Sequence, residues 1–203
     1  MREVEIKSVV DDLDARRRTV AVNGGRLVFE GRLEDRRYDT IDDALTARDE
    51  VLRLRTYRRD GRSDTALEWK GPRTIENGYR VRDEQSVNSG PLETLELILD
   101  RLGYRVTRAI DRHIVQFELE GAVVRFERYP RMDDLVEVEG EPVAIERAVA
   151  ALGMARDGFT GDSLADFVGR YERRTGTRAA LADADMLLAA GADRGDRDDG
   201  ARR

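Results

Sequence analysis

The chain has 203 residues, of which 38% are charged and 40% hydrophobic, and its formal net charge is -6. A surface with this acidic excess should not attract a polyanion such as DNA, so any anion site must be local. With no cysteine and one histidine, thiolate sites are excluded, and the carboxylates suit Mg²⁺, Mn²⁺ or Ca²⁺. No apolar run approaches the ~20 residues of a membrane span, and no signal peptide is evident. We therefore expect a cytoplasmic protein without a nucleic-acid or membrane partner.

The first predicted strand has one charged face. Glu3, Glu5 and Lys7 alternate with Val4 and Ile6, and side chains two residues apart in a strand point the same way. Two like charges at neighbouring positions of one face repel each other unless a cation lies between them. The face can simply be solvated, or its carboxylates can meet a metal ion or a group of Lys and Arg side chains.

The following elements continue this pattern of alternating strands joined by short turns, with few helices. Period-2 alternation predicts the strands, apolar residues at helical spacing predict the helices, and Gly and Pro residues mark the turns. We predict helices over residues 11–22, 91–102, 143–152 and 163–174, a short turn or helical piece over 42–49, and strands over 26–38, 51–58, 66–70, 78–87, 106–111, 114–120, 122–129 and 135–139.

The composition changes near the end of the chain. Residues 1–175 are predicted to form one domain of ordinary core size. Beyond them, Ala, Asp, Arg and Gly dominate and aromatic or β-branched residues are almost absent. We therefore expect residues 176–203 to be largely disordered, with at most a marginal, isolated helix over 179–190.

Eight or so alternating strands favour one large antiparallel sheet, curled or closed, in an α+β fold. The predicted helices must bury their apolar stripes. If they pack on the apolar faces of the strands, the charged faces point inward and line a channel that suits an anion with its metal ions. Otherwise the same faces meet water. The charged residues opposite apolar neighbours are Glu3, Glu5, Lys7, Arg53, Arg55, Glu68, Lys70, Arg80, Arg82, Glu84, Glu118, Glu120, Arg125, Glu127, Glu137 and Glu139.

Several motifs, in order, resemble the CYTH superfamily, the triphosphate tunnel metalloenzymes that include class IV adenylate cyclases and thiamine or inorganic triphosphatases. Glu3-Val4-Glu5-Ile6-Lys7 matches the family signature Glu-x-Glu-x-Lys. The resemblance covers residues 1–172. Its further motifs are Tyr38-Asp39-Thr40, Leu52-Arg53-Leu54-Arg55, Leu67-Glu68-Trp69-Lys70-Gly71-Pro72, Arg82-Asp83-Glu84, Leu102-Gly103-Tyr104, Arg112 and Val136-Glu137-Val138-Glu139.

The resemblance implies an eight-stranded antiparallel tunnel with a charged interior and helices packed outside. It also implies a small-molecule substrate that bears a triphosphate, such as ATP or inorganic triphosphate, and Mg²⁺ or Mn²⁺ as the cofactor. Similarity to class IV adenylate cyclases, which is greatest over residues 79–112, implies a homodimer. The acids that match the family's metal-binding residues are Glu3, Glu5, Glu137 and Glu139, with Glu127 where Asp is usual.

Cations at matching positions are implied to bind the phosphate groups. Two residues depart from the family pattern. Glu127 reaches one methylene further than Asp, which could shift a metal ion, and Asp111 stands where relatives commonly have Lys, a charge that Arg108 could replace. The implied phosphate-binding cations are Lys7, Arg53, Arg55, Lys70, Arg82 and Arg112.

Three functions remain open from the sequence. In the first, the ribose 3′-hydroxyl of ATP attacks to give cyclic AMP and pyrophosphate, as in a class IV adenylate cyclase. In the second, water attacks and the enzyme is an inorganic or organic triphosphatase. Charge neutralisation and alignment dominate both reactions, and Lys7 or Lys70 could accept a proton if desolvation lowers its pKa. In the third, the tunnel only binds polyphosphate.

Overall fold

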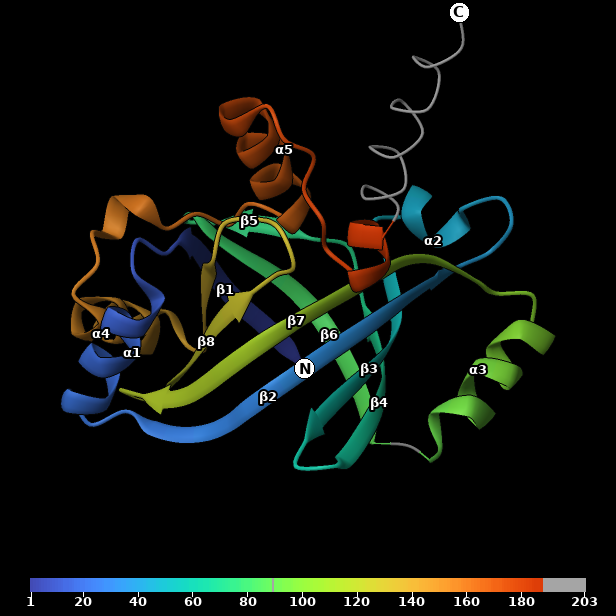
Figure 1. Cartoon of the computed structure of the whole chain (residues 1–203), viewed down its shortest axis with the longest axis horizontal. Helices are drawn as coiled ribbons and strands as arrows, with labels where there is room; N and C mark the ends of the chain where they lie inside the picture. Colours follow the sequence, from blue (N-terminus) through green and yellow to red (C-terminus); the bar gives the residue numbers. More distant parts are fainter. Residues whose placement is uncertain (89, 188–203) are drawn as a thin grey trace, which may run out of the picture.

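The computed structural model describes residues 1–88 and 90–187. Its main feature is an antiparallel sheet that closes into a barrel (Figure 1). The strands are β1 (Arg2–Val9), β2 (Arg26–Asp39), β3 (Val51–Arg59), β4 (Arg62–Lys70), β5 (Thr74–Glu76), β6 (Tyr79–Asn88), β7 (Arg105–Leu119), β8 (Ala122–Arg128) and β9 (Leu135–Glu139). The described helices are α1 (Leu13–Val22), α2 (Ala44–Ala47), α3 (Leu92–Arg101), α4 (Pro142–Leu152), η1 (Arg156–Gly158) and α5 (Leu164–Thr175).

Eight strands form the ring in the order β1-β9-β8-β7-β2-β3-β4-β6, and the pairing of β6 with β1 closes it. In the closing register, Glu3 lies opposite Arg82 and Glu5 opposite Arg80. The short strand β5 pairs with β6 outside this ring. The predicted closed antiparallel barrel is therefore confirmed, and the strand of alternating acids at the N-terminus is the element that closes it.

Apolar side chains on the outer wall of the barrel pack against α1 and α4. The side chain of Asp12 caps the start of α1 by accepting a hydrogen bond from the Ala15 N–H at 2.9 Å. Gly153, with a positive φ of 65°, ends α4. Because these helices cover the apolar side, the charged side of the strands is left facing inward. The outer core includes Val4, Ile6, Val124, Phe126, Val136 and Val138 from strands, with Leu13, Val20, Ile145, Val149 and Leu152 from helices.

A second apolar layer lies under α3, which packs against the outer wall formed by β2 and β3. Leu99 of α3 packs against Tyr38 and Leu54. Gly103 follows the helix with a φ of 86°, a conformation that favours glycine. The backbone N–H of Tyr104 then donates to the Leu99 carbonyl at 2.9 Å. This is the helix ending that the sequence predicted.

Helix α5 has a different position from the one expected. We expected it to cover the outer wall, but it lies across one end of the barrel (Figure 1). Its Phe167 packs with Ile110 and Tyr129, and these two residues line the interior of the barrel. The amphipathic pattern predicted the helix correctly but could not show which apolar surface it meets.

Strand β7 is one continuous element of 15 residues, whereas two strands were predicted over residues 106–111 and 114–120. In the structure Asp111 faces the outside, where Arg36 donates to it at 2.7 Å. The next residue, Arg112, faces the interior. Consecutive charged residues are therefore compatible with an unbroken strand because both faces of β7 carry partners for them.

The beginning of the C-terminal segment docks on the barrel, unlike the disorder predicted for residues 176–203. Ala180 forms a β-bridge with Arg131, and the Asp111 N–H donates to the Leu181 carbonyl at 2.7 Å. Residues 188–203, and with them the end of the helix predicted over 179–190, lie outside the described residues. Within the described ranges no helix combines the length and the apolar character needed to cross a membrane.

Candidate active site

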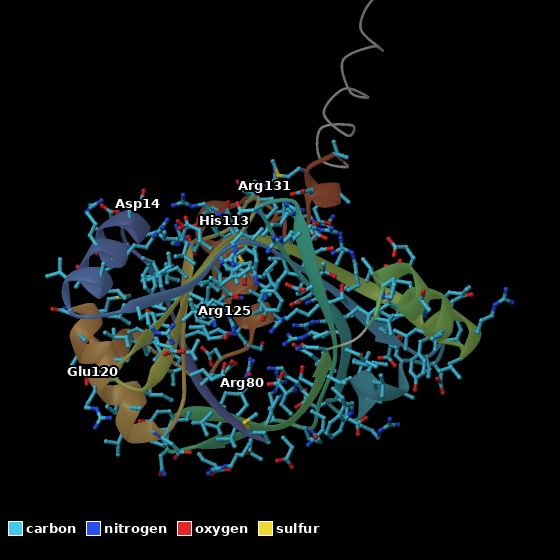
Figure 2. All side chains as sticks on the ribbon, turned by 90° about the horizontal axis from the view of Figure 1, so that it is seen from below. Asp14, Arg80, His113, Glu120, Arg125 and Arg131 are labelled. Atoms are coloured by element: carbon cyan, nitrogen blue, oxygen red, sulfur yellow. The ribbon has the colours of Figure 1, made fainter. Side chains whose placement is uncertain are left out.

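A cavity of about 160 Å³ lies inside the barrel, and α5 forms part of its rim through Ser163, Leu164 and Ala165. Figure 2 shows Arg80 and Arg125 within the ring of strands. Basic residues in the lining outnumber acidic ones by eleven to four. They are Lys7, Arg37, Arg53, Arg55, Lys70, Arg73, Arg80, Arg82, Arg108, Arg112 and Arg125, against Glu5, Asp35, Glu127 and Glu137.

All six predicted phosphate-binding cations line this one cavity. Their side chains come from β1, β3, β4, β6 and β7. The alternation of each strand places the cations inside, and the closed ring makes them converge. The six are Lys7, Arg53, Arg55, Lys70, Arg82 and Arg112.

The predicted metal-binding acids divide into two groups. Glu5, Glu127 and Glu137 line the cavity. Glu3 is buried beside it, where it forms an ion pair with Lys70. Glu139 lies opposite Glu5 in the register between β1 and β9, so its carboxylate is on the same face but outside the cavity lining.

The acidic side of the cavity is centred on Glu137. Its carboxylate forms an ion pair with Lys7 and accepts a hydrogen bond from Nη1 of Arg125 at 2.7 Å. Burial would raise the pKa of Glu137, but Lys7 and Arg125 outweigh this effect and hold the pKa well below its usual value. Glu137 is therefore ionised.

Glu5 experiences the opposite balance. It contacts Arg80, and its carboxylate lies 3.5 Å from Lys7. Burial and the neighbouring charge of Glu137 nevertheless raise its pKa. Burial also raises the pKa of Glu139 to about 7. The cations around Glu5 and Glu139 therefore compensate for burial less fully than those around Glu137 do.

Lys7 does not meet the condition set for a proton acceptor. Burial by itself would lower the Lys7 pKa, but Glu137 and Glu5 more than offset it, and the net shift is upward. Lys7 is thus a fixed cation in this arrangement. In this arrangement the pKa of Lys7 is raised and not lowered, and a role for Lys7 as a base stays a prediction.

The opposite wall holds arginines around a carboxylate. Arg55 donates from Nε and Nη2 to Asp35 at 2.8 and 3.0 Å, and Arg112 donates from Nη1 to the same carboxylate at 3.1 Å. Arg112 also donates from Nε to Glu127 at 2.9 Å. Glu127 in turn accepts a hydrogen bond from the Tyr129 hydroxyl at 2.7 Å. Glu127 is therefore engaged by two donors and has less freedom than Glu5 to bind a cation.

Some cations near the rim have no carboxylate partner in the described part of the chain. Arg37 lies opposite Arg108 in the register of β2 and β7, and neither forms an ion pair with any described residue. Burial, with Arg53 as the next cause, lowers the pKa of Arg37. Nε of Arg37 and Nε of Arg82 are buried without a hydrogen-bond acceptor. Like charges placed opposite each other are unfavourable unless an anion joins them.

The acids of the site fit the predicted Mg²⁺ or Mn²⁺ only in part. Among the described residues, no three acidic or histidine side chains converge as a ready metal site, because Lys and Arg side chains contact the cavity carboxylates. However, Oε2 of Glu3 is buried without a hydrogen-bond donor, and Glu5 meets both of its cations, Arg80 and Lys7, through Oε1 alone. Carboxylate oxygens with excess negative charge are the ligands that hard divalent cations prefer. Glu3, Glu5 and Glu139 therefore fit such an ion chemically.

Other charged residues differ from the sequence expectations. Glu118 and Glu120, counted with the charged faces, are exposed, and Figure 2 shows Glu120 at the outer edge. Asp111 faces outward, so the presence of Asp where relatives commonly have Lys removes no cation from the cavity. Arg108, suggested as the replacement for that cation, lines the cavity. Asp35 and Arg37 were not assigned to the site, although they share a face of the predicted strand over 26–38.

Comparisons with known proteins extend the fold assignment. No protein-family model and no curated protein matches the chain. A solved protein from Pyrococcus horikoshii OT3 is 23% identical, with a TM-score of 0.66 over 83% of this chain and 98% of that one. A putative adenylate cyclase from Vibrio parahaemolyticus is 21% identical, with a TM-score of 0.68 over 82% and 97%. A putative adenylyl cyclase from Hippeastrum, described as having a dominant triphosphatase activity, is 14% identical, with a TM-score of 0.61 over 88% and 98%.

These likenesses show a shared fold, a closed antiparallel barrel with charged residues inside. This is the fold that the resemblance to the CYTH superfamily implied, and the expectation is confirmed at that level. In this chain the fold gathers the six predicted phosphate-binding cations around a single cavity.

Proposed function

We propose that the protein is a metal-dependent enzyme that acts on a triphosphate chain bound inside the barrel. The observation that supports this most directly is the ratio of eleven basic to four acidic residues in the cavity lining. Buried cations are costly unless counter-charges meet them. Four further carboxylates, those of Glu3, Asp49, Glu68 and Glu84, pair with lining cations from outside the lining. The cations still outnumber the carboxylates, and a compact polyanion would supply the missing charge. Preorganised cations of this kind also stabilise charge that develops during phosphoryl transfer.

In this proposal the two walls have different tasks. Arg53, Arg55 and Arg112 bind nonbridging phosphate oxygens, since guanidinium groups match phosphate geometry. Mg²⁺ or Mn²⁺ would be held by Glu3, Glu5 and Glu139, and when bound it would neutralise charge on the phosphate oxygens. Lys7, kept protonated by Glu137, supplies a further fixed positive charge.

Hydrolysis is favoured over cyclisation by the size of the cavity. A volume of about 160 Å³ is smaller than the roughly 300–1,000 Å³ typical of pockets that enclose a drug-sized ligand. The cavity is thus suited to a phosphate chain, whereas a nucleoside would extend past the rim formed by Ser163 and Leu164. The triphosphatase activity described for the Hippeastrum protein also supports hydrolysis. The adenylate cyclase descriptions of that protein and the Vibrio protein keep cyclisation as the second candidate.

The test is to incubate the purified protein with Mg²⁺ or Mn²⁺ and either inorganic triphosphate or ATP, and to separate the products. Release of orthophosphate supports hydrolysis, whereas cyclic AMP with pyrophosphate supports cyclisation. Tight binding without either product would identify a polyphosphate-binding module. Glu5→Gln should abolish turnover, and Glu118→Gln, on the exposed end of β7, is the matched control that should not. Absence of both binding and turnover would refute the proposal.

A further inference from the structure

Asp35 is a carboxylate in the middle of the arginine wall, on β2 between β3 and β7. Its side chain is 1% exposed. Oδ1 accepts a hydrogen bond from Nε of Arg55, and Oδ2 accepts from Arg55 and from Arg112. Nη1 of Arg53 lies 3.6 Å from Oδ2. One carboxylate therefore contacts three of the predicted phosphate-binding cations.

The charge of Asp35 is unexpected at a site proposed to bind a polyanion. By Coulomb's law, a carboxylate beside the bound phosphates repels them, and burial makes the repulsion stronger than in water. If Asp35 acted only through its charge, removing that charge would tighten anion binding. A residue that opposes binding electrostatically needs another role to account for its place in the wall.

The hydrogen bonds of Asp35 indicate that role. Arg55 is held through Nε and Nη2, and Arg112 through Nη1 to Asp35 and through Nε to Glu127. Nη1 of Arg55 and Nη2 of Arg112 form no hydrogen bond to any described residue. Arg53 is held mainly by Glu68, to which its Nε donates at 2.6 Å, and Nη1 of Arg55 lies 3.6 Å from the same carboxylate. Among the described residues, Asp35 is the one carboxylate that joins Arg55 to Arg112. Without it, the mutual repulsion of these two guanidinium groups would drive them apart.

We propose that Asp35 is a positioning residue that holds the guanidinium groups of Arg55 and Arg112 together, beside Arg53, so that they bind one phosphate group at the same time. The inference rests on the proposed function and deepens it. Asp35 does not touch the substrate. It acts through the arginines, whose remaining N–H groups form the binding surface. The affinity that Asp35 adds by positioning the arginines is therefore larger than the affinity lost to its repulsion of the phosphate.

The experiment compares inorganic triphosphate binding by the wild type and by Asp35→Asn, using isothermal titration calorimetry at fixed ionic strength. Asparagine keeps the shape and removes the charge. A purely electrostatic role predicts tighter binding, and a positioning role predicts weaker binding. We expect the dissociation constant to rise about 10- to 100-fold, the loss of one well-placed hydrogen bond to a charged group, and KM to rise more than kcat falls. A dissociation constant equal to or lower than that of the wild type would overturn the inference.

Asp111→Asn is the matched control. Asp111 is also buried and paired with an arginine, Arg36, but it faces the outside of the barrel. The same loss of one buried charge should leave triphosphate affinity within about twofold of wild type, since its position is outside the cavity. An equal weakening by both substitutions would mean that any loss of a buried ion pair impairs binding, and would overturn the inference.

Asp35→Glu keeps the experiment decisive if Asp35→Asn does not fold, as far-UV circular dichroism would show. Glutamate retains the charge but moves it by one methylene, so the repulsion persists and the geometry changes. We expect weaker binding than in the wild type, and wild-type affinity would overturn the inference. The proposed function fails separately, on the wild-type measurement alone, if the unmodified protein binds no triphosphate.

Discussion

Glutamine substitutions of Glu5 and Glu137 should have opposite effects on the stability of the metal-free protein. Glu137 has two cationic partners, Lys7 and Arg125, and its pKa lies well below the usual value because these cations outweigh burial. An acid with a lowered pKa stabilises the folded state above its unfolded pKa. Glu137→Gln removes this stabilisation at pH 7 and leaves both cations without their main counter-charge.

The expected loss can be estimated from the burial of the pair. Breaking a buried ion pair by removing one partner typically costs about 3–5 kcal/mol. For a chain of this size, 1 kcal/mol shifts the melting temperature by about 2–4 °C. Glu137→Gln should therefore lower the melting temperature by roughly 10 °C.

Glu5 should respond in the other direction because burial and the charge of Glu137 raise its pKa. The folded protein then binds this proton more strongly than the unfolded chain, so the contribution of Glu5 to stability falls as pH rises above its unfolded pKa. The ionised form of Glu5 is therefore a net cost to the folded state. Glu5→Gln should leave the melting temperature unchanged or raise it, while still abolishing turnover.

Thermal melts at pH 7 in the presence of EDTA, followed by circular dichroism, measure both effects. Glu118→Gln, which changes an exposed glutamate outside the cavity, should shift the melting temperature by less than about 2 °C. A Glu5→Gln protein destabilised as much as Glu137→Gln would refute the conclusion that the cations around Glu5 compensate for its burial less fully than those around Glu137.

Three further outcomes are expected. Burial raises the pKa of Asp39, but hydrogen bonds from Thr46 and from backbone N–H groups lower it to about 2, so Asp39→Asn should cost up to about 2 kcal/mol at pH 7. In urea titrations this difference should vanish as pH falls from about 4 to about 2, and a constant difference would contradict it. Arg37→Gln should weaken triphosphate binding about tenfold in calorimetry without lowering the melting temperature, because Arg37 has no ion-pair partner among the described residues; a destabilised variant would speak against this. Ser163 and Asp166 form the capping box of α5, so Ser163→Ala should cost about 1 kcal/mol in the same melts, and Ser163→Thr much less.

The barrel could be predicted from the sequence because most strands carry charge on only one face. In β1, β3 and β9 the alternation is clear, and the structure places the charged side chains of these strands inside. Strand β2 was harder to interpret because residues 34–37 are all charged. Glu34 and Arg36 pair on the outer side with Arg58 and Asp111, while Asp35 and Arg37 face the cavity. No period-2 signal survives when both faces are charged.

The partners of the carboxylates also could not be predicted from one strand at a time. The pairing of Glu137 with Lys7 depends on the antiparallel register of β1 and β9, which places these two residues opposite each other. The position of α5 depends in the same way on contacts between distant segments, since Phe167 meets Ile110 and Tyr129. Spacing identifies a face of an element, but the closed ring determines which faces meet.

The closure of the barrel through β1 also has a consequence for how the chain folds. Glu5 must find Glu139 on one side and Arg80 on the other, so β1, which is synthesised before the other strands of the barrel, waits until almost the whole barrel has been made. Contacts between such distant parts of a chain form slowly, because a long loop must close before they can stabilise it. Until then, β1 has two unpaired edges and an uncovered apolar side that expose the nascent chain to aggregation. Folding should therefore depend on the completion of β9.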